Sequence, residues 1–272
     1  MINYLLLTIA VMAVSSASIL AVLAGAPGTA ASFWRFLISS LIMLAIYRTL
    51  PARRVMRYSL ISGFALALHM SAWIESLFHA SVALSTAIVC THSIFSGIFA
   101  SLLGERVRLR EVLGILVAIA GIYMLSGADY YAEPVGVALA FIGAVAGGVY
   151  FVSAKFSAGE NFGEYVVSTY ITAAIFAGIF AVLRGDALTG YSLETFTYFA
   201  LLAIIPMSAG HTILNYLIRR MKVVTVTGSV LGEVVGSTIL AALILGQKLT
   251  VEAYIYLSVI LLGIFIAVAK VD

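Results

Sequence analysis

Charge is the scarcest property of this sequence. Only 10% of its 272 residues are charged, whereas 63% are hydrophobic, and the mean hydropathy is +1.13. A soluble domain of this size needs roughly a quarter of its residues charged to keep its surface in water. The outer surface must therefore face an apolar medium, and lipid is the simplest one. The composition indicates an integral membrane protein and excludes an ordinary water-soluble domain.

Cysteine is nearly absent as well. Cys90 is the only one, which excludes an internal disulfide and a cysteine-rich metal site, and its apolar neighbours favour a packing role. The sequence also lacks a phosphate-binding Walker loop, a glycine-rich dinucleotide fingerprint and a His-x-x-x-His zinc motif. We therefore expect no cofactor, no metal and no enzymatic reaction.

Long apolar runs are what the sequence has in abundance. About 20 apolar residues are needed to cross a bilayer as a helix, and ten runs of this kind follow one another between short polar connections. We predict an all-α membrane protein with ten transmembrane helices. The predicted segments cover residues 3–23, 29–47, 58–79, 82–104, 109–126, 134–154, 164–183, 196–217, 223–245 and 253–270.

The basic residues fall on one side of this predicted topology. With a cytoplasmic N-terminus, only Arg184 and Lys248 lie in outer loops, and Arg35 lies within a segment. Basic loops mark the cytoplasmic side of a membrane, so we predict a multi-pass protein of the cell membrane with both termini cytoplasmic. The net charge of +3 then reflects the membrane topology, and we expect no nucleic-acid partner. The cytoplasmic set is Arg48, Arg53, Arg54, Arg57, Arg106, Arg108, Arg110, Lys155, Arg219, Arg220, Lys222 and Lys270.

A weak internal repeat divides the chain. Residues 101–107 resemble residues 243–249, and the same offset of 142 residues relates Gly121-Ile122 to Gly263-Ile264 and Thr91 to Glu233. Chance similarity between apolar segments is the alternative explanation. Because the first half would cross the membrane five times, an odd number, the second half would begin on the opposite side and be inverted. Inverted repeats of this kind support alternating access. We predict two inverted five-helix repeats, residues 1–128 and 129–272.

Several motifs resemble the EamA-type transporters of the drug/metabolite transporter superfamily. One is Leu103-Gly104-Glu105-Arg106, which leads into the fifth segment; others are Trp34-Arg35-Phe36 and Trp73–Leu77 with Ser81–Thr86. In the second half they are Gly210-His211-Thr212 with Asn215-Tyr216, and Leu231-Gly232-Glu233 with Gly236-Ser237-Thr238. The sequence departs from that family at Val234 and Ser93, where proline is frequent, and at Gln247, where the second half would close on glutamate. The resemblance implies a transporter of unspecified substrate.

Ionisable residues near the middle of the segments are the main candidates for a substrate site, because such groups are costly in lipid unless they are paired or hydrated. His69, His92 and Glu233 lie at this depth, and Thr91 is the repeat partner of Glu233. Glu233 has three open roles: accepting a cationic group, carrying a coupling proton, or forming a structural pair with a histidine.

Other polar residues are placed by helical spacing. His69 and Trp73 share a helix face and form either a wall for an aromatic or cationic ligand or an ordinary core contact. His211 and Asn215 follow Pro206 and either bind substrate or stabilise the broken turn, with Ser208 or water satisfying the freed carbonyl. Arg35 either reaches the outer surface or attracts an anion. The predicted substrate-binding residues are Arg35, His69, Trp73, Glu75, Thr91, His92, Tyr150, His211, Asn215 and Glu233.

These observations predict a secondary active transporter that exports a small metabolite, amino acid or drug-like compound by alternating access. Its expected partners are a small-molecule substrate and the lipid bilayer, with coupled protons and homo-oligomer formation left open. The alternative is an intramembrane enzyme that acts on a lipid or isoprenoid, with His69, His92 and Glu233 as acid and base. A non-transporting sensor or assembly factor is a third possibility, although no soluble output domain supports it.

Overall fold

The computed structural model describes residues 2–126, 132–246 and 250–268, and every regular element within them is helical. The elements in chain order are α1 (Ile2–Ser15), α2 (Ala17–Ala24), α3 (Gly28–Tyr47), α4 (Arg53–Ser76), α5 (Val82–Cys90), α6 (His92–Leu102), α7 (Leu109–Ser126), α8 (Pro134–Phe156), η1 (Ser157–Gly159), α9 (Phe162–Arg184), α10 (Leu193–Leu202), η2 (Ala203–His211), α11 (Thr212–Ile218), α12 (Val223–Val230), α13 (Gly232–Ile244) and α14 (Val251–Val268).

Each of the ten predicted segments coincides with one helix or with consecutive helices, and the ends differ by a few residues. Within the described residues, seven helical segments are long and apolar enough to cross a membrane: Ile2–Ala24, Gly28–Tyr47, Val82–Leu102, Pro134–Gly159, Phe162–Arg184, Leu193–Ile218 and Val223–Ile244. The protein is therefore a multi-pass membrane protein. The other three predicted segments correspond to α4, α7 and α14.

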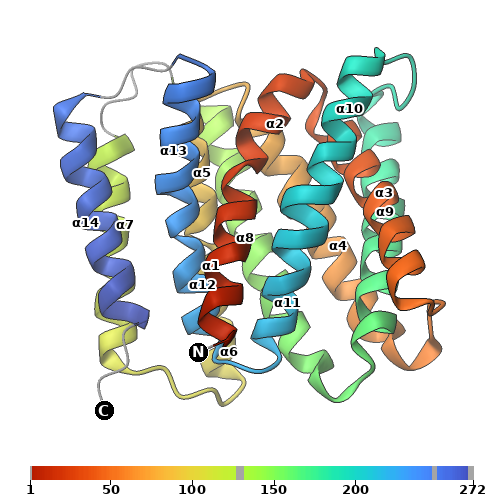
Figure 1. The fold of residues 1–272 in the computed structure, drawn as a ribbon, viewed down its shortest axis with the longest axis horizontal. Helices are drawn as coiled ribbons and strands as arrows, with labels where there is room; N and C mark the ends of the chain where they lie inside the picture. Colours follow the sequence, from red (N-terminus) through yellow and green to blue (C-terminus); the bar gives the residue numbers. More distant parts are fainter. Residues whose placement is uncertain (1, 127–131, 247–249, 269–272) are drawn as a thin grey trace.

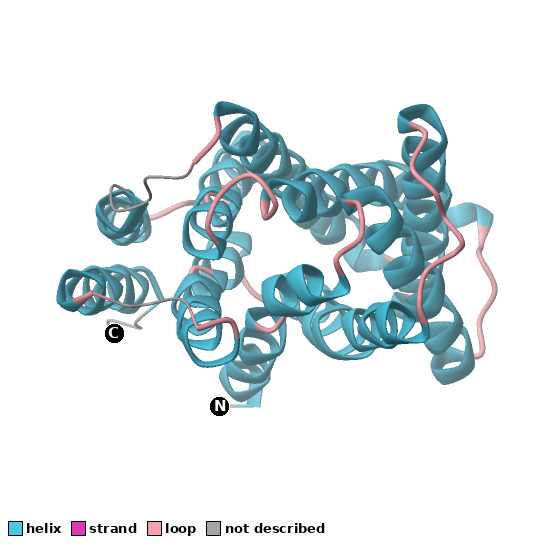
Figure 2. Ribbon diagram, turned by 90° about the horizontal axis from the view of Figure 1, so that it is seen from above, coloured by secondary structure: helices cyan, strands magenta, loops and turns pink. Residues whose placement is uncertain are grey.

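The helices run side by side in a single bundle (Figures 1 and 2). In Figure 1, α1 begins and α14 ends at the lower end of the bundle. The helices α7 and α14 form a closely packed pair at one edge. A Cβ on Gly114 would lie 2.4 Å from the Ala267 nitrogen, and one on Gly263 would lie 2.3 Å from the Ala118 nitrogen. Small residues thus let the two helix backbones touch, as is common in membrane bundles.

Two of the segments break near their middle in the same way. At Thr91, between α5 and α6, the backbone N–H bonds to the Ile88 carbonyl, and the Thr91 carbonyl accepts from Ile94. At Leu231, between α12 and α13, the equivalent bonds go to Gly228 and from Val234. The two tight turns make Leu231 the structural equivalent of Thr91. The sequence offset of 142 residues predicts Glu233 instead, which lies two residues further along the chain.

The eighth predicted segment contains an irregular stretch in place of a simple proline kink. Residues Ala203–His211 form a π-helix that includes Pro206 and joins α10 to α11. Such stretches relieve the backbone around a proline and are frequent at functional sites. The Ser208 hydroxyl, expected to satisfy a freed carbonyl, has no hydrogen-bond partner among the described residues.

Some predictions fall outside the described residues. The predicted boundary between the halves, at 128 and 129, is one of them, as are Lys248, Lys270 and Gln247.

Candidate functional site

A group of polar side chains lies buried in the middle of the bundle, and we call it the interior cluster. No member is more than 7% exposed. The members come from both predicted halves, on α3, α4, α6, α8, η2, α11 and α13. The interior cluster consists of Arg35, His69, Trp73, His92, Tyr150, His211, Asn215 and Glu233.

Glycines on α8 make room for the first histidine. The His69 Nδ1 atom is 2.7 Å from the Gly143 carbonyl oxygen, a hydrogen bond between α4 and α8. A Cβ on Gly147 would lie 2.8 Å from His69 Nδ1 and 3.1 Å from the His92 Cβ. Any larger residue at position 147 would therefore displace His69, because a close-packed interior leaves no room for a methyl group.

The three buried histidines are grouped around one another and around Phe151. The ring centroid of His69 lies 6.1 Å from that of His92 and 6.5 Å from that of His211. Phe151 lies 4.9 Å from His92 and stacks nearly parallel on His211 at 6.1 Å. Sequence reasoning missed Phe151, because an apolar aromatic residue in an apolar segment carries no distinguishing signal.

Tyr150 and Asn215 form a direct pair. The Asn215 amide donates to the Tyr150 hydroxyl at 2.7 Å, which joins α11 to α8. The prediction that Asn215 stabilises the broken turn with His211 is not what the contacts show, since its partner is on another helix. The Asn215 side-chain oxygen itself has no partner in the described part of the chain.

Arg35 and Glu233 are the charged members of the interior cluster. Arg35 is fully buried, and its Nη1 atom lies 3.4 Å from the Met70 sulfur, a weak acceptor. Of the two alternatives for Arg35, the one in which it reaches the outer surface is therefore wrong. Arg35 and Glu233 form no ion pair with each other.

Many polar atoms of the interior cluster lack a partner. Buried polar groups are normally hydrogen-bonded, and each exception needs an explanation. The atoms without a partner among the described residues are Arg35 Nε and Nη2, Trp73 Nε1, His92 Nδ1, His211 Nδ1 and Asn215 Oδ1. Donors and acceptors are both present, so the region has the chemistry to bind a small polar molecule. The described residues include no group of three or more His, Cys, Asp or Glu able to hold a metal ion.

Two predicted site residues lie elsewhere. Thr91 sits at the break between α5 and α6, half-buried, and its hydroxyl donates to the Ile88 carbonyl at 2.6 Å. Glu75 belongs to a network at the upper end of the bundle, where it accepts from Arg184 and from the Gly28 backbone, both at 2.8 Å. Asp186 joins this upper network through Thr29 at 2.6 Å and Arg184 at 3.2 Å.

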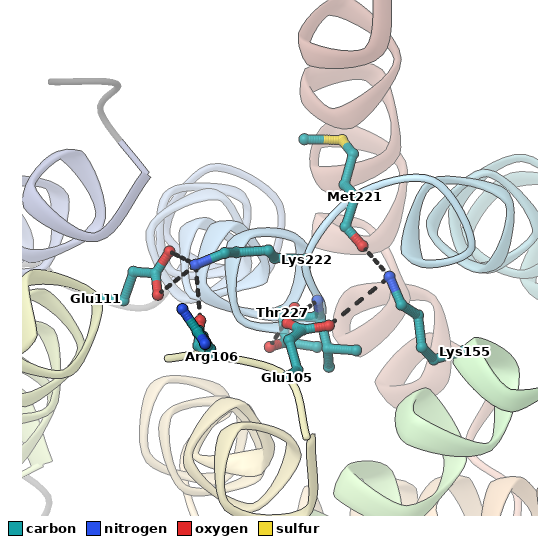
Figure 3. A network of polar contacts seen from close by, with 8 residues as sticks. Glu105, Arg106, Glu111, Lys155, Met221, Lys222 and Thr227 are labelled. Carbon is teal, nitrogen blue, oxygen red and sulfur yellow. Dashed lines mark hydrogen bonds and ion pairs between the residues drawn. The ribbon is translucent and has the colours of Figure 1, made fainter. Parts of the chain in front are cut away.

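The lower end of the bundle carries a second charged network, which Figure 3 shows. Lys222 donates to both Glu111 oxygens, at 3.0 and 3.2 Å, and to the Arg106 carbonyl at 2.8 Å. Lys155 donates to the Met221 carbonyl at 2.7 Å and pairs with Glu105 at 3.7 Å. Glu105 also accepts from the Val223 backbone N–H at 2.8 Å, which caps α12. We call these residues the lower network.

The chain matches the EamA-like transporter family over residues 1–127 and again over residues 134–269. It belongs to this family. Membership indicates a membrane transporter of the drug/metabolite transporter superfamily, as the motifs had implied. The EamA-like halves of this chain therefore meet around the interior cluster, to which each contributes side chains.

Solved structures support the same fold. One crystal structure is similar to this EamA-like chain with a TM-score of 0.80 at 20% sequence identity, covering 97% of this chain and 96% of that one. At this identity the likeness concerns the fold alone. No curated protein sequence is recognisably similar to this chain.

Proposed function

We propose that this protein is a secondary active transporter that exports a small metabolite, amino acid or drug-like compound by alternating access. In this proposal the chain crosses the cell membrane ten times and forms two inverted five-helix halves, residues 1–128 and 129–272. The interior cluster is the proposed substrate site. The observation that carries the proposal is its set of buried polar atoms, between the two family repeats, that have no partner among the described residues. Substrate sites of inverted-repeat transporters lie at this level.

Reciprocal helix contacts support the inverted arrangement. The third segment packs on the sixth through α4 and α8, and the eighth packs on the first through η2 and α1. Likewise α4 packs on α9, and η2 packs on α3. Three pairs relate equivalent segments directly: α3 with α9, α5 with α13, and α7 with α14. Exchanging the two halves therefore carries each of these contacts onto another, as a two-fold relation requires.

The breaks at Thr91 and Leu231 support a hinged mechanism. They occur in equivalent segments, and each lies beside a member of the interior cluster, His92 and Glu233 respectively. Hinges are a few element-terminal residues that absorb backbone rotation. Bending at these two points would open one end of the site while closing the other.

The end networks suggest which parts move together. The helices α4 and α9 are tied at both ends, by Arg54 with Glu164 below and by Glu75 with Arg184 above. The lower network instead joins the start of α12 to the first turn of α7, to the loop before α7 and to the end of α8, all at one end of the bundle. We propose that α4 and α9 move as one body and that the lower network is a gate, closed in this conformation.

The lower end is the proposed cytoplasmic side. Basic residues gather in cytoplasmic loops. The lower end is where α3, α6, α8 and α11 end and where α4, α7 and α12 begin (Figure 1). These helix ends and the connections between them carry eleven of the described Lys and Arg residues: Arg48, Arg53, Arg54, Arg57, Arg106, Arg108, Arg110, Lys155, Arg219, Arg220 and Lys222. Both termini would then be cytoplasmic.

Transport by the purified protein tests the function. Liposomes containing the protein are given a metabolite mixture and an imposed proton gradient, and compounds that cross are identified by mass spectrometry. We expect at least one compound to cross faster than in empty liposomes, with a rate that changes when a protonophore collapses the gradient. Folded protein that moves nothing under gradients of either direction would contradict the proposal.

Cysteine labelling tests the topology. Arg53 and Thr189 are exposed at opposite ends of the bundle, whereas the native Cys90 is buried and supplies the background. An impermeant maleimide should label Thr189→Cys on intact cells and Arg53→Cys only after the membrane is opened. Labelling in the reverse order would place the lower end outside and overturn the proposed orientation.

A further inference from the structure

The outer face of the bundle has a groove between α4 and α8. Its volume is about 580 Å³, and all the residues that line it are apolar. The groove opens outward, because Phe64 on one side and Phe141 on the other are 45% and 52% exposed. Phe64 is held in place by edge-on contacts with Phe176 and Phe180 of α9. The groove is thus a formed apolar surface that faces the lipid.

The groove is separate from the interior cluster. Behind it, α4 and α8 are in close contact: His69 Nδ1 lies 2.7 Å from the Gly143 carbonyl oxygen, and a Cβ on Gly143 would lie 3.1 Å from the His69 carbonyl oxygen. The polar side chains of the interior cluster lie beyond this contact. A polar substrate would find no hydrogen-bond partner in the groove, whereas a hydrocarbon chain would.

The groove has the depth of one leaflet. On α8 its lining runs from Phe141 to Val149, eight residues that span about 12 Å. One leaflet contributes about 15 Å of hydrocarbon. On α4 the groove ends above at Leu68, next to His69 near the middle of its segment, and below at Leu60. An acyl chain of a lipid in the lower leaflet would occupy this depth.

Arg57 marks the lower end of the groove. It precedes Leu60 by one helical turn and lies on the same face of α4 as Leu60 and Phe64. Arg53 lies one turn further down. Both arginines are exposed, and neither forms an ion pair in the described part of the chain. The Arg57 guanidinium only lies over the neighbouring Tyr58 ring, at 4.5 Å from its centroid.

The arginine between these two is different. Arg54 is paired with Glu164 through both of its carboxylate oxygens, at 2.7 and 2.6 Å. Arg53 and Arg57 therefore leave two positive charges without an acidic partner among the described residues. They lie where the headgroup of a lipid in the groove would be. Basic residues at this level attract anionic headgroups.

A second copy of the chain is less suited to the groove. Two copies in one membrane are related by an axis along the membrane normal, so residues at the same depth face each other. Arg53 and Arg57 of the two copies would then approach one another and repel. We propose that the groove binds one phospholipid with an anionic headgroup, with an acyl chain between α4 and α8 and the phosphate at Arg57 and Arg53.

Lipid retention tests this on the unmodified protein. The protein is reconstituted into vesicles of equal parts dioleoyl phosphatidylglycerol and dioleoyl phosphatidylcholine, extracted in mild detergent, and weighed with its bound lipid by native mass spectrometry. We expect phosphatidylglycerol to be retained at least about tenfold over phosphatidylcholine, because two basic residues favour the anionic headgroup. Equal retention of the two lipids would overturn the proposal.

One variant tests the headgroup contact. Arg57→Gln should lower the preference for phosphatidylglycerol by about fivefold, the effect of one basic residue at the membrane surface. The matched control is Arg108→Gln, which removes an exposed charge at the same end of the bundle, in the loop before α7, and should leave the preference unchanged. An unaltered preference in folded Arg57→Gln protein would show that Arg57 does not hold the headgroup.

A second variant tests the acyl chain contact. Val145→Trp places a bulky ring in the groove and should reduce the retention of both lipids at least about fivefold. Its matched control is Val182→Trp, at a site on α9 that is 73% exposed and outside the groove, which should retain lipid normally. Normal retention by folded Val145→Trp protein would overturn the proposal. If that variant does not fold, the Arg57→Gln result decides.

The same spectra report the oligomeric state. A dimer that Val145→Trp separates into monomers would assign the groove to a second copy and overturn the lipid site. The site requires only that the chain crosses a bilayer, so it is tested independently of the proposed transport. Failure of transport in liposomes would leave the lipid result standing.

Discussion

The interior cluster and the lower network both contain charged side chains but differ in how those side chains are paired. In the lower network, Lys222 and Lys155 each donate to more than one acceptor. In the interior cluster, Arg35 is more deeply buried and yet has two donors without a partner among the described residues. Deeper burial should favour more complete pairing, because unsatisfied polar groups cost most where water is excluded. The satisfied network joins helices, whereas the unsatisfied cluster is suited to a ligand.

The largest expected effect is in the interior cluster. Glu233→Gln keeps size and hydrogen-bonding capacity but removes the negative charge. If Glu233 binds or carries the transported cation or proton, net transport in liposomes should fall at least about 100-fold, because the cation or proton loses its buried anionic partner. Substrate exchange without a gradient serves as the control, since exchange requires no net proton movement.

A structural role for Glu233 predicts a different result. The melting temperature would then drop while the remaining transport kept its dependence on the proton gradient. Normal gradient-driven transport by a well-folded Glu233→Gln protein would remove Glu233 from the mechanism and direct attention to His69, His92 and His211.

A smaller effect is expected in the lower network. Lys222→Gln removes the ion pair between Lys222, whose side chain is 34% exposed, and the buried Glu111. We take this pair to be worth on the order of 1 kcal/mol, which corresponds to about a fivefold shift in an equilibrium. We expect molecules to open more often at the lower end. The labelling rate of a cysteine placed at Ser153, near the end of α8, measures this opening.

A charge exchange provides the matched control for that gate. Lys222→Glu combined with Glu111→Lys restores opposite charges at the same positions, and the labelling rate should return toward that of the unmodified protein. An unchanged rate in Lys222→Gln would mean that the lower network fastens helices without controlling access.

The smallest effect is expected at the surface. His79 and Glu133 form a pair at 2.7 Å at the upper end, with side chains 31% and 60% exposed. Exposed pairs contribute little, so His79→Gln should change the free energy of unfolding by no more than about 0.5 kcal/mol. Transport should also be unaltered. A large loss of either would mean that this connection between α4 and α8 has a part in gating.

Much of the interior cluster could be predicted from depth alone. His69, His92 and Glu233 each lie near the middle of a long apolar run, and polar residues there turn inward because lipid cannot satisfy them. Depth does not say what Glu75, on the same helix as His69, contacts: Arg184 holds it at the upper end. Arg184 is 109 residues away in the chain, and no local pattern connects the two.

Which residues each side chain contacts could not be predicted either, because these contacts join residues that are far apart in the chain. Phe151 carries no polar signal, and the Asn215 contact with Tyr150 joins residues 65 apart. Arg35 could equally have reached outward from its helix, until the packing of α4 and α9 around it enclosed the guanidinium.

By itself, the sequence determined that the chain is a membrane protein and where its helical segments lie to within a few residues. A helix in lipid must satisfy its own backbone, so each apolar run specifies a helix locally. Only the tertiary structure decided which polar groups are paired and which remain open. That outcome depends on contacts between helices. Arg54 holds Glu164, whereas two donor atoms of Arg35 have no partner in the described part of the chain, and this difference exists only once the helices are packed.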